Sequence, residues 1–274
     1  MKAAAFDYVR AKDVGEAVRQ LASMPGDAKP IAGGQSLGPM LNLRLARPKL
    51  LVDLSRIESL RTISDEGDAW RIGAAVTHSQ LEDQPLAGCA PLAQVARFIA
   101  YRAVRNRGTV GGSLAHADPA ADWPVVLAAL GATVFLVGTK GKREVAADRF
   151  MSSAFATALA DDEIVESVRV PKLSAGASWG YYKFCRKTGE FPEAAAALLL
   201  DPGRRVARLY AGALDRPPQP LDAVARTLAQ GGAQAVTADM IDAALQRAAP
   251  GLGPIARKLR ATAVRRAISR ALPS

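Results

Sequence analysis

Apolar residues recur at helical spacing in several stretches of the chain. Residues 13–22 carry apolar side chains three and four positions apart, the spacing of one face of an α-helix. Asp13 followed by Glu16 resembles a capping box in which Asp replaces the usual Ser or Thr. Residues 91–100 repeat the same spacing, and the Ala- and Arg-rich C-terminal part predicts further helices. Those helices are expected near 221–229, 237–249 and 255–271.

Shorter runs, either apolar throughout or alternating, predict β-strands between the helices. The expected strands are "KPI" before the first Gly-Gly pair, 49–54, 69–76, 162–170, 179–186, 193–200 and 204–214. Residues 122–138 begin as a helix and turn into a strand near Thr133. Because strands and helices are mixed without strict alternation, the pattern predicts an α+β fold. The linker-like run "PKLSAGAS" at 171–178 divides it, and three antiparallel strands with helices follow.

The composition argues against a membrane protein and against a disulfide-rich secreted protein. The chain has 274 residues, enough for two or three compact units, and no apolar run reaches the roughly 18–20 residues of a membrane helix. We see no signal peptide and expect no membrane span. The only two cysteines, Cys89 and Cys185, lack the spacing of a disulfide framework or a metal site, so a reducing, cytoplasmic location is expected.

The net charge of +10 is spread along the chain and is densest at 257–270. With only 5% aromatic residues there is no stacking platform for bases, so we expect no nucleic-acid partner. A basic C-terminal helix is instead a candidate surface for assembly with larger partners.

Two Gly-Gly pairs stand in similar surroundings, "IAGGQSLGP" at 31–39 and "TVGGSLAHADPAAD" at 109–122. Glycine adopts positive φ readily and has no Cβ, so each pair can bend the backbone and turn its N–H groups toward a ligand such as a diphosphate. Neither loop contains the Lys of a P-loop or reads GxGxxG, which disfavours those nucleotide sites. The residues alone leave two readings open, a pair of ordinary turns or a cradle for a dinucleotide.

Other chemistry has little support in the sequence. The only histidines are His78, which opens an expected helix and suits a capping or surface role, and His116, which lies inside the second motif. Two histidines without a cysteine cluster predict no metal site. There are no paired catalytic carboxylates, and neither Ser36 nor Ser113 has an evident base, so we expect no catalytic residue acting on an organic substrate.

Two longer stretches carry a family resemblance. "AGGQSLGPMLNLRLARPKLLVDL" and, about 75 residues on, "VRNRGTVGGSLAHADPAADWP" resemble the FAD-binding medium subunit of the molybdenum hydroxylases, the carbon-monoxide-dehydrogenase and xanthine-dehydrogenase family. The resemblance implies a PCMH-type, vanillyl-alcohol-oxidase-like FAD-binding domain over 1–174, with subdomains of about 1–57 and 58–174. A C-terminal domain of the CO-dehydrogenase flavoprotein type would cover 175–274. The chain departs from the family pattern at 100–103, 186–192 and 255–270.

The resemblance also assigns residues to the cofactor, with its diphosphate between the two loops. One side would be lined by Ala32, Gly33, Gly34, Gln35, Ser36 and Leu37, and the other by Thr109, Val110, Gly111, Gly112 and Ser113. His116 and Asp118 would be neighbours of the site, and Asp122 would bind the adenosine half. Ile164 and Lys183 would lie near the flavin, where the lysine would favour an anionic reduced ring.

The implied function is an FAD-carrying electron-transfer subunit. It would take electrons from the [2Fe–2S] clusters of a small subunit and pass them to a terminal acceptor, while a large subunit holds the molybdenum cofactor and the substrate. By family analogy the assembly is a dimer of heterotrimers. The alternatives are a stand-alone FAD oxidase or dehydrogenase and a flavin-free scaffold protein of the same fold.

Overall fold

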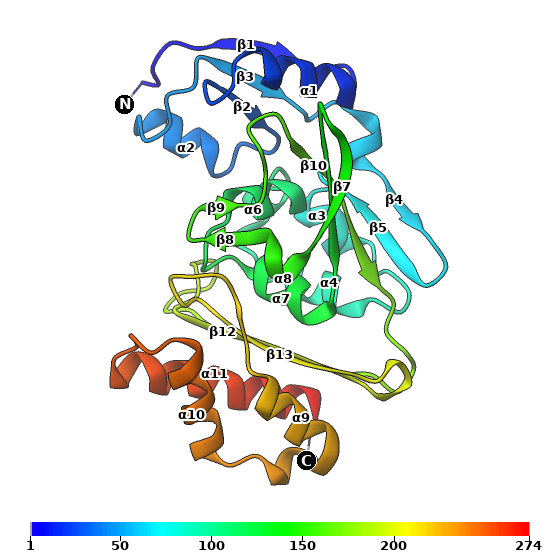
Figure 1. The fold of residues 1–274 in the computed structure, drawn as a ribbon, viewed down its shortest axis with the longest axis vertical. Coiled ribbons are helices and arrows are strands. Elements are labelled where there is room, and N and C mark those ends of the chain that lie inside the picture. Colours follow the sequence, from blue (N-terminus) through cyan, green and yellow to red (C-terminus); the bar gives the residue numbers. More distant parts are fainter. Residues whose placement is uncertain (1, 274) are drawn as a thin grey trace.

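Three β-sheets follow one another along the long axis of the molecule, and helices fill the space between and beyond them (Figure 1). The structure is a computed structural model that describes residues 2–273. A two-stranded ribbon completes the β-structure, so the chain is a mixed α and β protein, as the sequence predicts. No helix among residues 2–273 is both long and apolar enough to cross a membrane.

The N-terminal sheet is parallel, with the strand order β1-β3-β2. Its elements are β1 (Asp7–Arg10), α1 (Val14–Ser23), β2 (Ala28–Ile31), α2 (Leu37–Asn42) and β3 (Leu50–Asp53). The Asp13 carboxylate accepts a bond from the Glu16 N–H at 2.7 Å, and the Glu16 carboxylate accepts from the Lys12 N–H at 2.8 Å. This is the predicted capping box displaced by one residue, and it begins α1 where the apolar spacing begins. The sequence analysis missed β1 and α2.

The middle sheet is antiparallel and has the order β4-β5-β10-β6-β7. Its strands are β4 (Ile63–Asp65), β5 (Ala69–Gly73), β6 (Thr133–Gly138), β7 (Gly141–Ala146) and β10 (Ile164–Pro171), and β8 (Met151–Ser153) pairs with β9 (Ala156–Thr157). The helices are η1 (Glu58–Arg61), α3 (His78–Asp83), α4 (Ala90–Ala96), α5 (Arg102–Arg105), α6 (Val110–His116), α7 (Asp122–Leu130) and α8 (Ala147–Phe150).

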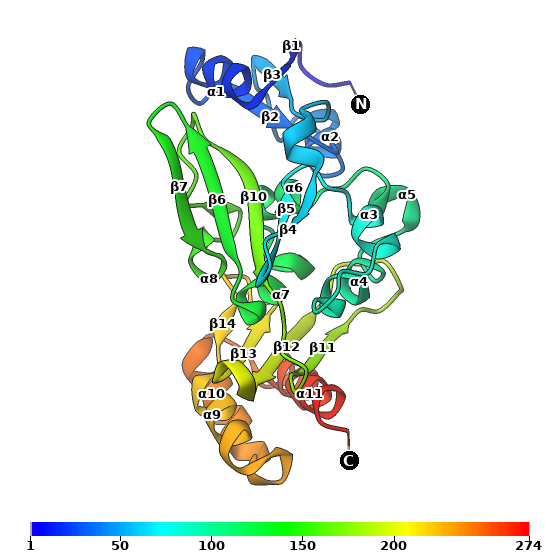
Figure 2. The same cartoon turned by 90° about the vertical axis from the view of Figure 1, so that its right-hand side faces the viewer.

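The C-terminal sheet has the order β11-β12-β13-β14, one short strand more than predicted. It comprises β11 (Ser178–Phe184), β12 (Ala194–Asp201), β13 (Val206–Gly212) and β14 (Gln219–Pro220), with η2 (Pro202–Arg204) between β12 and β13. Three helices cover its outer face (Figure 2). They are α9 (Asp222–Gly231), α10 (Ala238–Ala248) and α11 (Pro254–Ala271), and the short η3 (Ala233–Ala235) follows α9. The predicted C-terminal helices are therefore confirmed.

Helix α7 and strand β12 join the middle and C-terminal parts. Every residue of both elements is buried. Along β12, Ala195, Ala197 and Leu199 pack into the core that contains α7, while the alternate residues face the C-terminal helices. A strand buried on both faces reads as a continuous apolar run, which explains "AAAALLL". The predicted domain division at residue 174 stays a prediction, since one apolar core extends across it.

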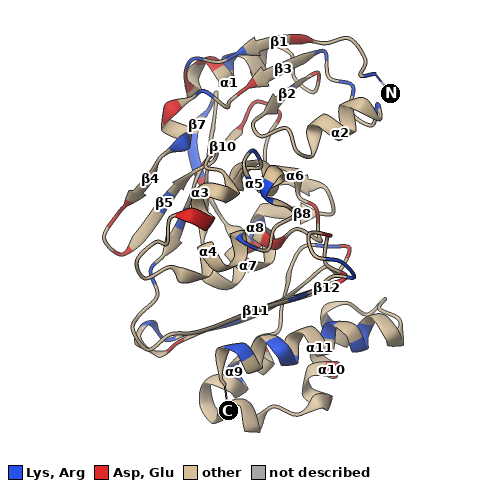
Figure 3. Cartoon of the chain, turned by 180° about the vertical axis from the view of Figure 1, so that it is seen from behind, with Lys and Arg blue, Asp and Glu red and all other residues tan. Residues whose placement is uncertain are grey.

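Several Lys and Arg residues lie along α11 (Figure 3), and most of them bond within the chain. The guanidinium groups of Arg266 and Arg270 each lie 4.9 Å from the centroid of the Tyr182 ring, and Arg270 donates to the Tyr181 carbonyl. Arg260 donates to the carbonyls of Ala213 and Ala256. The charge run at 257–270 therefore serves largely to attach the helix to its own sheet.

Candidate functional site

The two Gly-Gly motifs meet in the folded chain. A Cβ added at Gly33 would lie 2.6 Å from the Arg107 carbonyl carbon, closer than real Cβ atoms come to backbone. The Arg107 Nε in turn donates to the Gly33 carbonyl at 3.3 Å. Since Arg107 and Gly108 lead directly into the second motif, the missing side chain at position 33 lets the motifs lie backbone against backbone.

The first motif presents a row of free backbone donors. Within the described residues, the N–H groups of residues 33–37 donate no hydrogen bond. Gly34 has φ +70°, which turns the chain sharply, and the Gln35 side chain folds back to bond the Gly33 carbonyl at 3.2 Å. Successive N–H groups in such a turn form a concavity that suits an anion, so this segment has the donors that a phosphate requires.

The second motif is built differently, because its glycines lie in the first turn of α6. Val110 and Gly111 donate to the carbonyls of Val76 and Ala74, at 3.1 and 2.9 Å, and the Gly112 N–H donates to the Thr109 hydroxyl at 3.0 Å. The expectation that both Gly-Gly pairs turn free N–H groups toward a ligand is therefore wrong for this one. A Cβ at Gly111 would lie 2.7 Å from the Ala74 carbonyl oxygen, so glycine here allows the helix to approach β5.

Toward solvent, the second motif offers a surface almost without side chains. Gly112 is exposed and Ser113 is half-buried, so a ligand could approach the backbone of α6 closely and meet one hydroxyl. Thr109 is buried and its hydroxyl serves as the helix cap. The segment therefore presents a backbone surface with few side chains.

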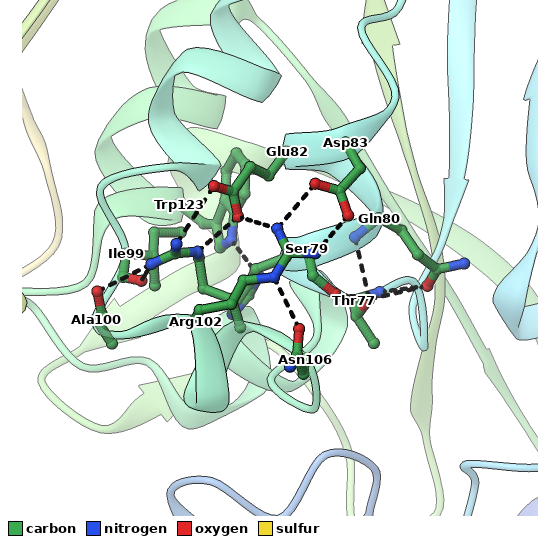
Figure 4. Close-up of polar contacts among 12 residues, drawn as sticks. Thr77, Ser79, Gln80, Glu82, Asp83, Ile99, Ala100, Arg102, Asn106 and Trp123 are labelled. Atoms are coloured by element: carbon green, nitrogen blue, oxygen red, sulfur yellow. Dashed lines mark hydrogen bonds and ion pairs between the residues drawn. The ribbon is translucent and has the colours of Figure 1, made fainter.

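A polar cluster holds the segment before the second motif in place (Figure 4). The buried guanidinium of Arg105, on α5, donates to the Glu82 carboxylate of α3 at 2.8 Å and to the carbonyls of Ile99 and Ala100, both at 3.0 Å. The Arg105 side chain, through its hydrogen bonds, holds the pKa of Glu82 below its ordinary value. Arg102 pairs with Asp83 on the exposed side of the same helix. These bonds fix α5 and hence the position of Arg107.

His78 connects the two ends of the second motif. Its N–H donates to the Gly108 carbonyl at 2.9 Å, and its Nδ1 accepts from the Trp123 indole at 3.1 Å. The imidazole is buried, and burial, with the charge of Arg105, lowers its pKa to about 4. The surface role expected for His78 is wrong, and Thr77 provides the helix cap instead.

Asp122 and Lys183 form a buried ion pair. The Lys183 Nζ lies 2.8 Å from Asp122 Oδ1, and the Tyr181 hydroxyl donates to the same oxygen at 2.5 Å. The sequence-based assignment placed Asp122 at the adenosine half of the dinucleotide and Lys183 at the flavin. An extended dinucleotide cannot place its two ends at atoms in direct contact, so these two assignments cannot both hold. The carboxylate also offsets the charge by which Lys183 was expected to act on a flavin ring.

The remaining predicted residues are distributed around this core. Ile164 is buried in the core that covers the N-terminal sheet, so of the two contacts that the resemblance allows, by backbone or by side chain, only the backbone contact fits this position. The half-buried His116 ring lies 5.4 Å from the Phe155 ring, and the Asp118 carboxylate accepts from the Ala120 N–H at 2.8 Å. His116 is the last residue of α6, and Asp118 lies on the segment that follows it.

Sequence reasoning missed Glu82, Arg105 and Arg107, which support the motifs. The run "VRNRGT" contains both arginines, but no spacing rule says which of them faces inward. Two stretches that depart from the family pattern also prove to be neighbours. A Cβ at Gly189, which has φ +90°, would lie 2.9 Å from the Tyr101 ring. Residues 100–103 and 186–192 therefore lie in contact, so a substitution in one stretch affects the packing of the other.

A family profile, several relatives and solved structures match this chain. A family profile described as FAD binding domain in molybdopterin dehydrogenase matches residues 4–173. Over 197 residues the chain is 42% identical to the carbon monoxide dehydrogenase medium chain of Hydrogenophaga pseudoflava, covering 71% of this chain and 69% of that one. It is 40% identical over 202 residues to the nicotine 6-hydroxylase medium subunit of Paenarthrobacter nicotinovorans, covering 73% and 70%. A chain of reconstituted CO dehydrogenase from Oligotropha carboxidovorans superposes with a TM-score of 0.91 at 32% identity, covering 99% of each chain.

Proposed function

Because the chain belongs to the family of FAD-binding domains in molybdopterin dehydrogenases, we propose that it carries FAD and relays electrons within a multi-subunit oxidoreductase. Its relatives are medium chains of dehydrogenases and hydroxylases, so the chain is an oxidoreductase subunit. The large and small partners, and the path of electrons between them, are part of the proposal.

The residues of the first motif suit the cofactor's diphosphate. The free N–H groups of residues 33–37 are the observation that carries this assignment, because successive N–H groups in a turn form a concavity that binds an anion. When bound, FAD supplies a redox centre that accepts and releases electrons singly or in pairs. The chain's own contribution is to hold the diphosphate, to keep the motifs together through Gly33 and Arg107, and to present the backbone surface at Gly112 and Ser113.

Residues beyond the motifs would orient the rest of the cofactor. The ion pair of Asp122 and Lys183 brings equal and opposite charges to the junction of α7 and β11. Held by the Tyr181 hydroxyl, the pair is a rigid polar group with little net field. We assign both residues to one end of the cofactor. Their role is to position it and to exclude water, with no proton transfer to a substrate.

The proposed electron path begins outside the chain. A small subunit with [2Fe–2S] clusters would donate electrons, and a large subunit would hold the molybdenum cofactor and the organic substrate. This division of labour rests on the family. If the substrate is bound by the large subunit, this chain needs no catalytic side chain. This agrees with a site whose polar residues mainly hold the backbone in place.

The test is a visible absorption titration of the purified chain with FAD and, separately, with FMN. Flavin bands that saturate with FAD, together with release of FAD on denaturation, would support the proposal. Gly33→Ala is expected to weaken FAD binding, since the added methyl pushes the Arg107 backbone away. A wild-type chain that binds neither flavin and gains no thermal stability from them would overturn it in favour of a flavin-free scaffold.

Reduction kinetics then test the relay. With the small subunit reduced chemically and mixed with the FAD-loaded chain, flavin absorbance should bleach only when the two proteins form a complex. Turnover of an alcohol or aldehyde by the isolated chain would instead favour a stand-alone oxidase.

A further inference from the structure

The turn that ends α2 holds two leucines out into solvent. The Arg44 N–H donates to the Leu41 carbonyl at 3.0 Å and the Leu45 N–H to the Met40 carbonyl at 2.9 Å. This pair of bonds is a Schellman motif, in which the residue at the Arg44 position adopts the left-handed conformation. That position usually belongs to glycine, yet here Arg44 has φ +57°. The chain thus keeps a cationic side chain where the backbone disfavours any side chain.

The apolar contact that usually accompanies this motif is absent. A residue in the place of Leu45 normally packs back against the last turn of the helix. Here the Leu45 side chain is 72% exposed and Leu43 is 53% exposed. Two large apolar side chains on a strained turn thus leave more than half of their surface exposed in the described chain, which points to burial by another molecule.

A cationic hollow adjoins the leucines. The N-terminal arm from Lys2 to Phe6 runs beside α2 at one end of the molecule (Figures 1 and 3) and borders, with Arg44 and Arg47, an open hollow of about 710 Å³. Arg44 donates to the Lys2 carbonyl and Arg47 to the Arg44 carbonyl, at 3.0 and 3.1 Å. Among residues 2–273 no carboxylate pairs with these three cations, whereas many other arginines of the chain are paired.

We propose that Leu43, Leu45 and the hollow lined by Lys2, Arg44 and Arg47 form a docking surface for a partner subunit of the complex. The partner is expected to present an apolar depression for the leucines, bordered by Asp or Glu side chains that pair with the cations. This inference rests on the proposed function, because it takes the chain to be one subunit of an oxidoreductase complex. Unpaired cations around an apolar centre match the anatomy of a specific interface, with charges at the rim.

The C-terminal helix is the competing surface. Ile255 at its start is 87% exposed, but among the described residues of this helix it is the one exposed large apolar side chain. The turn after α2 instead combines two exposed leucines with a hollow lined by cations. Ile255 therefore serves as the matched control.

The experiment uses the full chain co-expressed with its large and small subunits, with assembly measured by gel filtration and affinity by titration of the separated components. Leu45→Glu places a like charge against the expected carboxylates and should weaken assembly by at least about tenfold. Arg44→Gly keeps the turn and removes a cation. It should weaken assembly several-fold and make it less sensitive to salt, while the isolated chain keeps or gains thermal stability. Ile255→Glu should leave assembly unchanged.

Three results would overturn the inference. The first is normal assembly of Leu45→Glu and Arg44→Gly. The second is loss of assembly with Ile255→Glu alone. The third is self-association of the isolated chain that Leu45→Glu abolishes, which would make the occupant a second copy. FAD titration of the same proteins separates the two proposals. Leu45→Glu is expected to bind FAD with the affinity of the wild type. If the wild-type chain binds no flavin but still assembles through Leu45, only the proposed electron relay is contradicted.

Discussion

The indole of Trp123 donates a hydrogen bond of 3.1 Å to the imidazole Nδ1 of His78, across 45 positions of sequence. The bond fixes the ring as the tautomer with its proton on Nε2, and the pair joins α7 to the start of α3. Because the His78 backbone also bonds Gly108, both ends of the second Gly-Gly motif are tied to one buried residue.

This burial predicts a loss of stability in mild acid. The folded pKa of His78 is about 4, below the ordinary 6.5, so between these values the unfolded chain binds the proton more readily. The free energy of unfolding should therefore be fully retained above pH 6.5 and fall by up to about 3 kcal/mol as the pH drops to 4. Urea unfolding at a series of pH values measures this. His78→Gln should remove the slope above pH 4.5, while His116→Gln should preserve it.

Glycine at position 34 should matter for cofactor binding and not only for folding. Gly34 and Gly26 have φ of +70° and +76°, and a Cβ at either meets nothing closer than 3.5 Å. Each alanine variant should therefore lose about 1 kcal/mol of stability through backbone strain alone. Gly34→Ala should also lower FAD affinity by about tenfold, because it redirects N–H donors. Equal FAD affinities of the two variants, measured by fluorescence titration, would argue against the donor row at residues 33–37.

Arg105 and Arg102 stand three positions apart and should respond differently to lysine. Arg105 uses its planar fork on Glu82 and on two backbone carbonyls in a buried setting, which lysine cannot reproduce. We expect Arg105→Lys to lower the unfolding free energy by about 2 kcal/mol and to weaken FAD binding. Arg102→Lys, on an exposed surface pair, should leave the stability almost unchanged. Similar losses in the two variants would contradict a positioning role for Arg105.

The ion pair of Asp122 and Lys183 predicts strong coupling. Removing either partner leaves a buried charge, so Asp122→Asn and Lys183→Met should each cost about 3–5 kcal/mol. The double variant should cost clearly less than the sum of both, as a double-mutant cycle by urea unfolding would show. Strict additivity would mean that the two groups do not stabilise each other. Because the Tyr181 hydroxyl also donates to Asp122, Tyr181→Phe should lower the unfolding free energy by less than the loss of either charged partner.

Local patterns determined most of the elements. The apolar spacing of residues 13–22 gives α1, the run at 162–170 gives β10, and the Ala-rich C-terminal part gives three helices, since periodicity and capping act over a few residues. The two long motifs identified the family. Elements without such periodicity, α2 and β1 among them, were missed because tertiary packing stabilises them more than their own sequence does.

Only the tertiary structure decided what each Gly-Gly pair does. From the local sequence, both pairs are predicted to bend the backbone and to leave N–H groups free. In the fold, Ala74 and Val76 accept the amides of the second pair, and Arg107 lies against Gly33, so one pair becomes part of a helix and the other a donor row. The partners of a backbone amide or a buried charge come from distant segments, as with Asp122 and Lys183. The sequence therefore determined which elements and family to expect, and long-range packing decided which groups remain free to bind.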